Sequence, residues 1–168
     1  MDNKIELESA VNGYDLTVKR IMEKEDGIKE IFANRLDRLA ASPYSCIILF
    51  NKQVAGFANL VKEKNNDDFL FVDMGIIASF RGKSICNDVL KYFGDIEIKE
   101  FIIGETKIDN IPANKVASNV GCFIFAEEDR NFYLIQKNRY CEFIKYGYLD
   151  KLKQHIEKPN VKKLIINR

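Results

Sequence analysis

The apolar and polar positions of residues 4–40 predict one strand followed by two helices. Residues 4–11 alternate isoleucine and leucine with glutamate, which is typical of a strand that buries one face. Residues 14–23 and 26–40 carry apolar side chains three and four positions apart, a spacing that places them on one side of a helix. The chain therefore begins as a strand and two amphipathic helices.

Two β-rich runs, residues 46–50 and 54–62, flank a short polar turn and predict a hairpin. Gly56 inside the second run predicts a β-bulge or the close approach of another backbone. After a polar turn at residues 65–68, the stretch 69–77 is an almost continuous apolar run. A strand without a polar face is typical of the centre of a sheet, where both faces are covered.

The second half of the chain predicts a helix, a strand, a short helix and a final hairpin. Residues 84–93 show helical spacing, and residues 101–108 have the composition of a strand. Residues 112–119 predict a short helix that begins near a proline and ends before Gly121. Residues 122–136 hold two β-rich runs around a polar turn, which predict the hairpin.

This order of elements predicts an α/β (α+β) fold with a mixed, mostly antiparallel central sheet flanked by helices. A strand, a helix and a strand in succession favour a parallel pair, whereas hairpins pair antiparallel. Beyond the sheet, residues 140–157 predict one amphipathic helix and residues 161–167 a last strand. A chain of 168 residues suits one domain.

The composition argues against several classes of protein. The net charge of +1 gives no global attraction to nucleic acid or to an anionic membrane. The first residues lack the apolar segment of a signal peptide, and no apolar run approaches the roughly 20 residues of a membrane helix. The cysteines and the single histidine form no metal-binding pattern, so we expect no metal site and mostly buried thiols in a reducing cytoplasm. These cysteines are Cys46, Cys86, Cys122 and Cys141.

The stretch Ser-Phe-Arg-Gly-Lys-Ser, residues 79–84, joins the apolar strand to the helix that follows. The first turn of a helix has unpaired N–H groups and a partial positive charge, so amides that wrap this turn converge on a point that fits a pyrophosphate. Gly82 lets the backbone come close, and Arg81 and Lys83 add positive charge. The alternative is a surface turn whose two cations are solvated.

This loop and its flanks resemble motif A of the GNAT N-acetyltransferase superfamily, V-x-P-x-[YF]-[RQ]-G-x-G-x-[GA] followed by a helix. Ile76 stands at the valine, Phe80 at the aromatic position, and Arg81 and Gly82 follow as in the motif. Three other positions exchange one small residue for another, so the loop can still admit a pyrophosphate. These are Ala78 for proline, Ser84 for glycine and Cys86 for glycine or alanine.

A second part of the resemblance lies at the expected distance. The superfamily continues with a strand that contains a glutamate, then N-x-x-[AS], a short helix and G-[FY]. These positions hold Glu105, Asn110, Ala113, Gly121 and, at the aromatic position, Cys122. The resemblance covers residues 4–137 and is that of a divergent bacterial-type member. It implies a GNAT acyltransferase domain over residues 1–139 and an extension over residues 140–168 that packs on the domain or on a second subunit.

The resemblance implies acetyl-CoA as the cofactor, bound where two parallel central strands splay apart. The main chain of the first strand then pairs with the pantetheine arm, and the basic loop holds the pyrophosphate. The residues implied in cofactor binding are Met74, Gly75, Ile76, Ile77, Arg81, Gly82, Lys83, Ser84, Ile85, Cys86, Asn110 and Asn114.

Catalysis in this superfamily needs a base for the amine and an acid for the leaving thiolate. Glu105 resembles the base of the ribosomal-protein alanine N-acetyltransferase branch; the alternative is a solvent-facing carboxylate at a sheet end. Asp73 is the second candidate, because a lone acid in an apolar strand is costly unless paired and such groups gather at active sites. The alternative for Asp73 is a structural hydrogen bond or salt bridge. Ala117 stands where many members have the tyrosine that acts as the acid. Tyr133 is therefore the candidate acid, and the alternative is that Tyr133 only packs in the core. Bound water could also supply the proton.

The sequence therefore predicts an N-acetyltransferase that moves an acetyl group from acetyl-CoA to a primary amine of a small molecule or a protein N-terminus. One alternative is a GNAT-fold protein that binds CoA or a partner without catalysis, and another is a structural domain whose basic loop binds nothing. We also expect a cytoplasmic protein that can form a homodimer, with no nucleic-acid or membrane partner.

Overall fold

A computed structural model describes residues 4–9, 14–32, 42, 44–63 and 66–157 of the chain. Seven strands form one sheet in the order β1-β2-β3-β4-β5-β7-β6. The strands are β1 (Ile5–Ser9), β2 (Cys46–Phe50), β3 (Gln53–Lys62), β4 (Phe69–Ile76), β5 (Phe101–Lys107), β6 (Cys122–Glu127) and β7 (Arg130–Leu134). The helices are α1 (Tyr14–Lys24), α2 (Asp26–Phe32), α4 (Ile85–Asp95), α5 (Ile111–Val120), α6 (Tyr140–Lys145) and α7 (Tyr148–Glu157), with short 3-10 turns η1 (Ala78–Phe80) and η2 (Lys137–Arg139).

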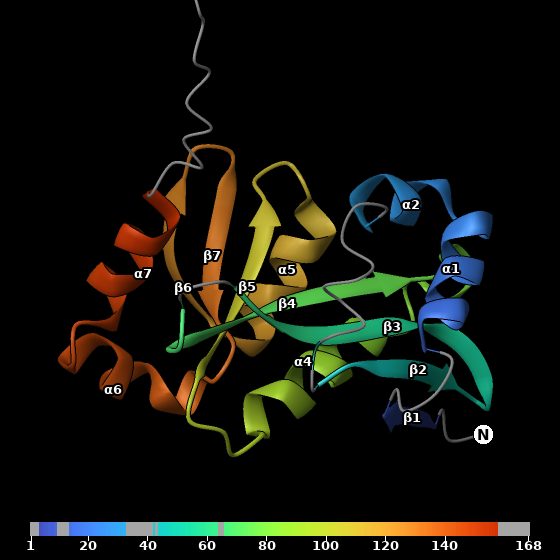
Figure 1. Cartoon of the computed structure of the whole chain (residues 1–168), viewed down its shortest axis with the longest axis horizontal. Coiled ribbons are helices and arrows are strands. Elements are labelled where there is room, and N and C mark those ends of the chain that lie inside the picture. Colours follow the sequence, from blue (N-terminus) through green and yellow to red (C-terminus); the bar gives the residue numbers. More distant parts are fainter. Residues whose placement is uncertain (1–3, 10–13, 33–41, 43, 64–65, 158–168) are drawn as a thin grey trace, which may run out of the picture.

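The sheet is mixed, as the sequence predicts, and its parallel pair opens. Strands β4 and β5 are parallel, whereas every other neighbouring pair is antiparallel. The β4–β5 pairing covers only the first residues of each strand and ends at Phe71 and Ile103. Beyond that point β5 pairs with β7 alone, and Figure 1 shows β4 and β5 running in different directions. The main chains of the two central strands therefore separate beyond Phe71 and Ile103, and this separation is called the opening between β4 and β5.

The two faces of the sheet are covered by different helices. Helices α4 and α5 pack on one face, in a cluster that includes Ile48, Leu60 and Ile102. The opposite face has two separate clusters: α1 and α2 pack near β2 and β3, and α6 and α7 pack near β4, β5 and β7. Because successive side chains of a strand alternate between faces, the two faces of β4 and β5 can be assigned from these clusters.

Gly56 combines both features that the sequence predicts for it. The register between β2 and β3 shifts between Ile48 and Leu49, where β3 carries an extra residue and forms a bulge. A Cβ atom on Gly56 would lie only 2.1 Å from the carbonyl oxygen of Gly75 on β4, so no side chain fits at this position. The bulge and the close contact fix how β3 lies against the end of β4.

The C-terminal segment differs from the prediction of one helix over residues 140–157, which is wrong. The chain forms α6 and α7 instead, with a break at Gly147, whose φ of +72° favours glycine. Phe143 of α6 and Leu152 of α7 are both fully buried on the sheet, where the Phe143 ring contacts Phe69 and Phe101. The break lets both helices place an apolar side chain in the same cluster.

The cysteines are less uniform than predicted. Cys46 is buried, and burial raises the pKa of its thiol to about 11. Cys86 and Cys122 are half-buried, whereas Cys141 is exposed, so the prediction of a buried thiol is wrong for Cys141. None of the helices among the described residues has the length and apolar character needed to cross a bilayer.

Some sequence predictions lie outside the described residues. The helix predicted over residues 26–40 is described to Phe32, and residues 33–40 lie outside. The strand predicted at residues 161–167 also lies outside them. The domain boundary after residue 139, the homodimer and the cytoplasmic location stay predictions.

Candidate active site

The opening between β4 and β5 exposes one edge of β4. In a strand, the main-chain N–H and C=O groups of successive residues point to opposite sides. The Ile77 N–H donates to the Ala55 carbonyl of β3 (2.9 Å), which turns odd-numbered residues of β4 toward β3. The Asp68 carbonyl accepts from the Phe101 N–H of β5 (2.8 Å), which turns even-numbered residues toward β5.

This alternation divides the four predicted pantetheine-binding residues into two pairs. Met74 and Ile76 point their main-chain groups toward β5, beyond the last β4–β5 pair, and so into the opening. Gly75 and Ile77 direct theirs to β3. An extended ligand with amide groups could therefore continue the sheet along Met74 and Ile76, as an added strand does.

The loop after β4 has an unusual backbone that shapes the start of α4. Gly82 and Ser84 both have left-handed conformations, with φ of +77° and +61°. Ser84 is the residue before α4, and its carbonyl accepts the first helical hydrogen bond from the Asp88 N–H (3.2 Å). The first-turn N–H groups of α4 thus follow directly on the loop at the end of β4, and N–H groups at a helix start can bind an anion. A positive φ favours glycine, which is the residue that the resembled motif has in place of Ser84.

The two cations of the loop make different contacts. The Lys83 ammonium lies over two aromatic rings, 5.1 Å from the centre of Phe50 and 5.0 Å from that of Phe80. Arg81 folds back instead, and its Nε donates to the Ile76 carbonyl (3.1 Å). Arg81 therefore contacts the main chain at the end of β4, whereas Lys83 packs on the two aromatic rings.

The first two residues of α4, Ile85 and Cys86, are partly or fully buried. Ile85 is buried in the core under α4, so only its main chain can serve a ligand. Cys86 packs half-buried against the same cluster, and burial raises the pKa of its thiol. The thiol of Cys86 is thus directed to the protein interior.

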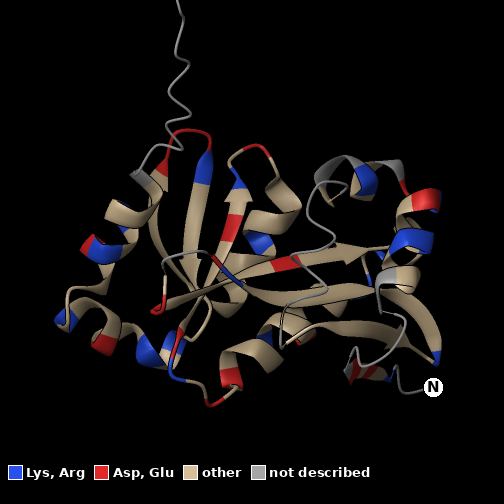
Figure 2. Ribbon diagram, in the orientation of Figure 1, with Lys and Arg blue, Asp and Glu red and all other residues tan. Residues whose placement is uncertain are grey.

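Asp73 and Glu105 occupy equivalent positions on the two diverging strands. Each lies two residues beyond the last β4–β5 pair and therefore on the same face, opposite to α4 and α5. Figure 2 shows the acidic positions of both strands in red. Asp73 is buried beside Asn59 of β3, whereas Glu105 is more exposed and forms an ion pair with Arg130 of β7. The structure brings both predicted base candidates to the opening.

Tyr133 lies apart from these carboxylates. Its ring packs in the cluster on the α4/α5 face, and its hydroxyl donates to Asn114 Oδ1 (2.9 Å). Asn114 Nδ2 in turn donates to the carbonyls of Lys107 (2.8 Å) and Asn110 (2.9 Å), which holds the connection from β5 to α5. Tyr133 and Asn114 are thus joined to each other in a network that stabilises this connection.

Asn110 and Ala117, at the start of α5 and within it, also have structural roles. Asn110 is the N-cap of α5, and its Oδ1 accepts from the Ala113 N–H (3.2 Å). Ala117, at the position of the usual tyrosine, is buried in the core. The sequence analysis did not identify Glu25, although its carboxylate accepts from the Ala78 N–H in the loop after β4.

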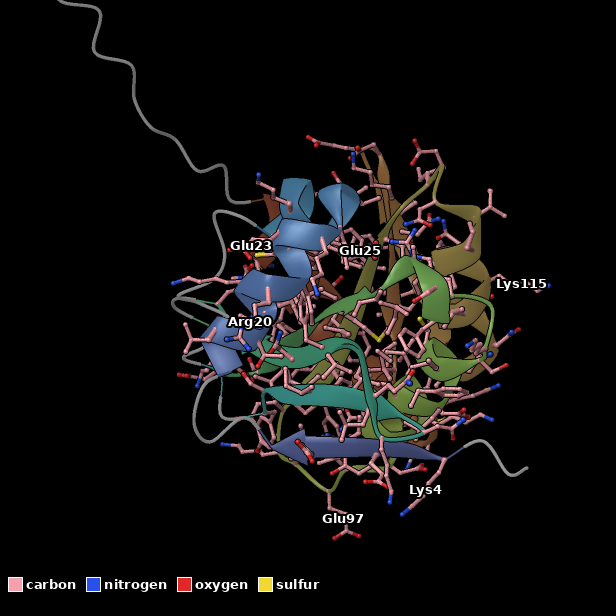
Figure 3. All side chains as sticks on the ribbon, turned by 90° about the vertical axis from the view of Figure 1, so that its right-hand side faces the viewer. Lys4, Arg20, Glu23, Glu25, Glu97 and Lys115 are labelled. Atoms are coloured by element: carbon pink, nitrogen blue, oxygen red, sulfur yellow. The ribbon has the colours of Figure 1, made fainter. Side chains whose placement is uncertain are left out.

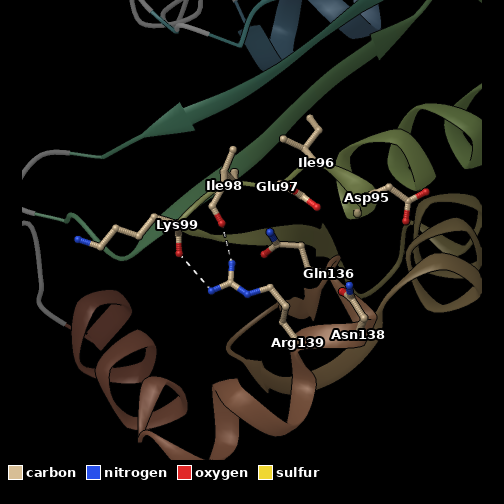
Figure 4. Close-up of a pocket in the computed structure, with 9 residues that line it drawn as sticks. Asp95, Ile96, Glu97, Ile98, Lys99, Gln136, Asn138 and Arg139 are labelled. Atoms are coloured by element: carbon tan, nitrogen blue, oxygen red, sulfur yellow. Dashed lines mark hydrogen bonds between the residues drawn. The ribbon is translucent and has the colours of Figure 1, made fainter.

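A separate cavity of about 390 Å³ lies at the other end of β4, near the start of β5. Figure 4 shows residues of the β7–α6 connection facing the loop that precedes β5. Arg139 donates to the carbonyls of Ile98 (3.1 Å) and Lys99 (3.1 Å) and lies over the Phe101 ring. The guanidinium therefore ties this loop to the connection that leads into α6.

No protein-family model matches the chain, and no curated protein matches it. Solved structures do match. The acetyltransferase MccE for microcin C7 self-immunity, solved with acetyl-CoA and AMP, is 15% identical with a TM-score of 0.56, over 79% of this chain and 92% of that chain. A GNAT-family acetyltransferase from Streptococcus agalactiae is 11% identical with a TM-score of 0.58, over 77% of this chain and 93% of that chain. The N-acetyltransferase PseH from Campylobacter jejuni, solved with acetyl coenzyme A, is 13% identical with a TM-score of 0.52, over 77% of this chain and 96% of that chain. The chain thus has the fold of the GNAT acetyltransferases, as its motifs predicted.

Proposed function

We propose that the protein is an acetyl-CoA-dependent N-acetyltransferase that acetylates a primary amine of a small molecule or a protein N-terminus by direct attack. The observation that supports this proposal is the divergence of β4 and β5, with the main-chain groups of Met74 and Ile76 turned away from β3 and the start of α4 following the loop at the end of β4. Acetyl-CoA bound to two solved proteins of the same fold supports the cofactor assignment.

In this proposal the main chain of β4 and the loop after it bind the two ends of the cofactor. Met74 and Ile76 hydrogen-bond the amides of the pantetheine arm, and the N–H groups from Gly82 to Cys86 bind the pyrophosphate. Arg81 adds charge from the edge of the opening. Ser84 either donates its hydroxyl to a phosphate or turns its side chain away.

The proposed reaction needs no covalent enzyme intermediate. The amine nitrogen attacks the thioester carbonyl carbon, its proton passes to a carboxylate, the C–S bond breaks and the thiolate takes up a proton. Glu105 and Asp73 are the candidate bases, since they share a face at the opening. Tyr133 could supply the last proton only after its hydroxyl leaves Asn114, so bound water is the simpler source.

Two carboxamide variants identify the base. Replacing the true base, Glu105→Gln or Asp73→Asn, should lower kcat about 10²–10⁴-fold. Asp129→Asn is the matched control, because Asp129 also contacts Arg130 but lies at the tip of the last hairpin. If both Glu105→Gln and Asp73→Asn keep wild-type activity, neither carboxylate is the base.

Free-thiol release from acetyl-CoA in the presence of a panel of primary amines tests the whole proposal. Amine-dependent release, with the acetylated amine found by mass spectrometry, supports an acetyltransferase. The alternative, a GNAT-fold protein that binds CoA without catalysis, is favoured by Ala117, Ser84 and Cys86 at motif positions. It predicts that acetyl-CoA raises the Tm while no amine in the panel releases the thiol.

A further inference from the structure

Glu25 connects the N-terminal helices to the loop after β4. Its carbonyl accepts from the N–H groups of Ile28 (3.0 Å) and Lys29 (3.0 Å), so its main chain is fixed at the start of α2. Its side chain is only 16% exposed and extends from α2 to the loop. Figure 3 labels Glu25 at this junction, on the opposite side of α1 from Glu23.

The two carboxylate oxygens of Glu25 contact different parts of the loop. Oε1 accepts from the Ala78 N–H (3.2 Å), and Oε2 lies 3.7 Å from Nη2 of Arg81. Arg81 is held at a second point, because its Nε donates to the Ile76 carbonyl (3.1 Å). Glu25, Arg81 and Ile76 therefore form a continuous chain of polar contacts that ends at the opening.

Helix α2 is itself fixed on β4 close to this chain. A Cβ atom on Gly75 would lie 3.3 Å from Ile28 Cγ2 and 2.7 Å from the Phe57 ring, so α2 sits directly on the strand there. Because α2 is anchored at Gly75, the Glu25 carboxylate is a rigid attachment point for the loop. The position of Arg81 thus depends on a residue 56 positions earlier in the chain, from Glu25 to Arg81.

We propose that Glu25 is a positioning residue for the cofactor site, which holds Ala78 and Arg81 where the amides of the loop can converge on a phosphate. This inference rests on the proposed function, since the loop is taken as the pyrophosphate site. Glu25 does not touch the ligand; it acts through the Ala78 N–H and the Arg81 guanidinium.

Calorimetric titration with CoA tests the inference on four proteins: wild type, Glu25→Ala, Glu25→Gln and the control Glu23→Ala. Glu25→Ala should raise the Kd about tenfold, since it removes both contacts. Glu25→Gln should stay within about threefold of wild type, because the amide oxygen still accepts from Ala78 and a negative charge near the phosphates is removed. Glu23 is exposed and its variant should bind as the wild type does.

A double-mutant cycle with Arg81→Ala shows whether Glu25 acts through Arg81. If it does, Glu25→Ala should weaken CoA binding less in the Arg81→Ala background than in the wild type. The same Kd for Glu25→Ala and wild type overturns the inference. So does equal weakening in Glu25→Ala and Glu25→Gln together with a fall in the Tm of both, which would indicate a general structural role. Failure of the wild type itself to bind CoA would instead overturn the proposed function.

Discussion

Replacing Ser84 by glycine should stabilise the fold. Ser84 has φ of +61° and ψ of +6°, a left-handed conformation that costs an ordinary L-residue roughly 1–2 kcal/mol. Within the described residues its side chain makes no capping hydrogen bond to α4, so its removal costs little there. Glycine also increases the entropy of the unfolded chain, which offsets about 0.4–1 kcal/mol of the gain. The net expectation is a stabilisation of about 0.5–1 kcal/mol, which for a chain of this size raises the Tm by roughly 1–4 °C.

Thermal unfolding of the wild type, Ser84→Gly and Ser84→Ala separates the backbone effect from the hydroxyl. Ser84→Ala keeps the Cβ atom and the strained conformation, so it should not gain stability. A Ser84→Gly protein that melts below the wild type would refute the assignment of backbone strain. CoA binding by the same variants shows the role of the side chain: weaker binding by both means that the hydroxyl contacts the cofactor, and tighter binding by Ser84→Gly means that the side chain obstructs it.

Four further outcomes follow from the packing and exposure of individual side chains. Gly75→Ala should destabilise the protein by about 1–3 kcal/mol in urea unfolding, because its Cβ would lie 2.7 Å from the Phe57 ring; a wild-type midpoint would contradict the tight packing of Phe57 on β4. Exposed Cys141 should react rapidly with a thiol reagent at pH 8, whereas buried Cys46, with a thiol pKa raised to about 11, should react only on unfolding; peptide mapping distinguishes the two. Since an ordinary thiol has a pKa of 9.0, the contribution of Cys46 to stability should be present below pH 9 and be lost as the pH rises toward 11. Arg139→Ala should lower the free energy of unfolding by about 1–3 kcal/mol, since it leaves partly buried carbonyls unpaired; an unchanged value would show that water replaces the guanidinium.

The sequence was sufficient for the sheet because each strand is specified locally. The apolar run of β4 predicts a central strand, and Gly56 predicts a bulge or a close backbone contact, both of which are found. The loop after β4 could also be proposed as an anion site, because its residue types and its place between a buried strand and a helix are local features. The backbone conformation of this loop could not be predicted, since the residue type of Ser84 does not indicate a positive φ.

The break between α6 and α7 shows where periodicity misleads. Ile144, Tyr148 and Leu152 keep a four-residue, helical spacing across Gly147, and a glycine inside a helix costs only about 1 kcal/mol. The break is decided by long-range packing, because Phe143 and Leu152 both become fully buried on the sheet. The periodicity of apolar residues along the chain does not predict such contacts with distant strands.

The same limit applies to individual site residues. Glu25 has no local signal, because its contacts with Ala78 and Arg81 arise only when α2 docks on β4. Asn114 and Tyr133 were singled out by motif position and residue type, but the fold joins them in a network away from the two carboxylates. Residue type and spacing therefore predict the region of the candidate site, whereas tertiary contacts determine which side chains lie together there.

Hydrogen–deuterium exchange of β4 and its loop, with and without acetyl-CoA, tests the central claim most directly. The N–H groups of Met74 and Ile76 point into the opening rather than to β3, so they should exchange quickly in the free protein. Millimolar acetyl-CoA should slow the exchange of these two amides and of those from Gly82 to Cys86, and leave the hairpin of β6 and β7 unchanged. Unchanged exchange at Met74, Ile76 and the loop at this concentration would contradict a CoA site between β4 and β5.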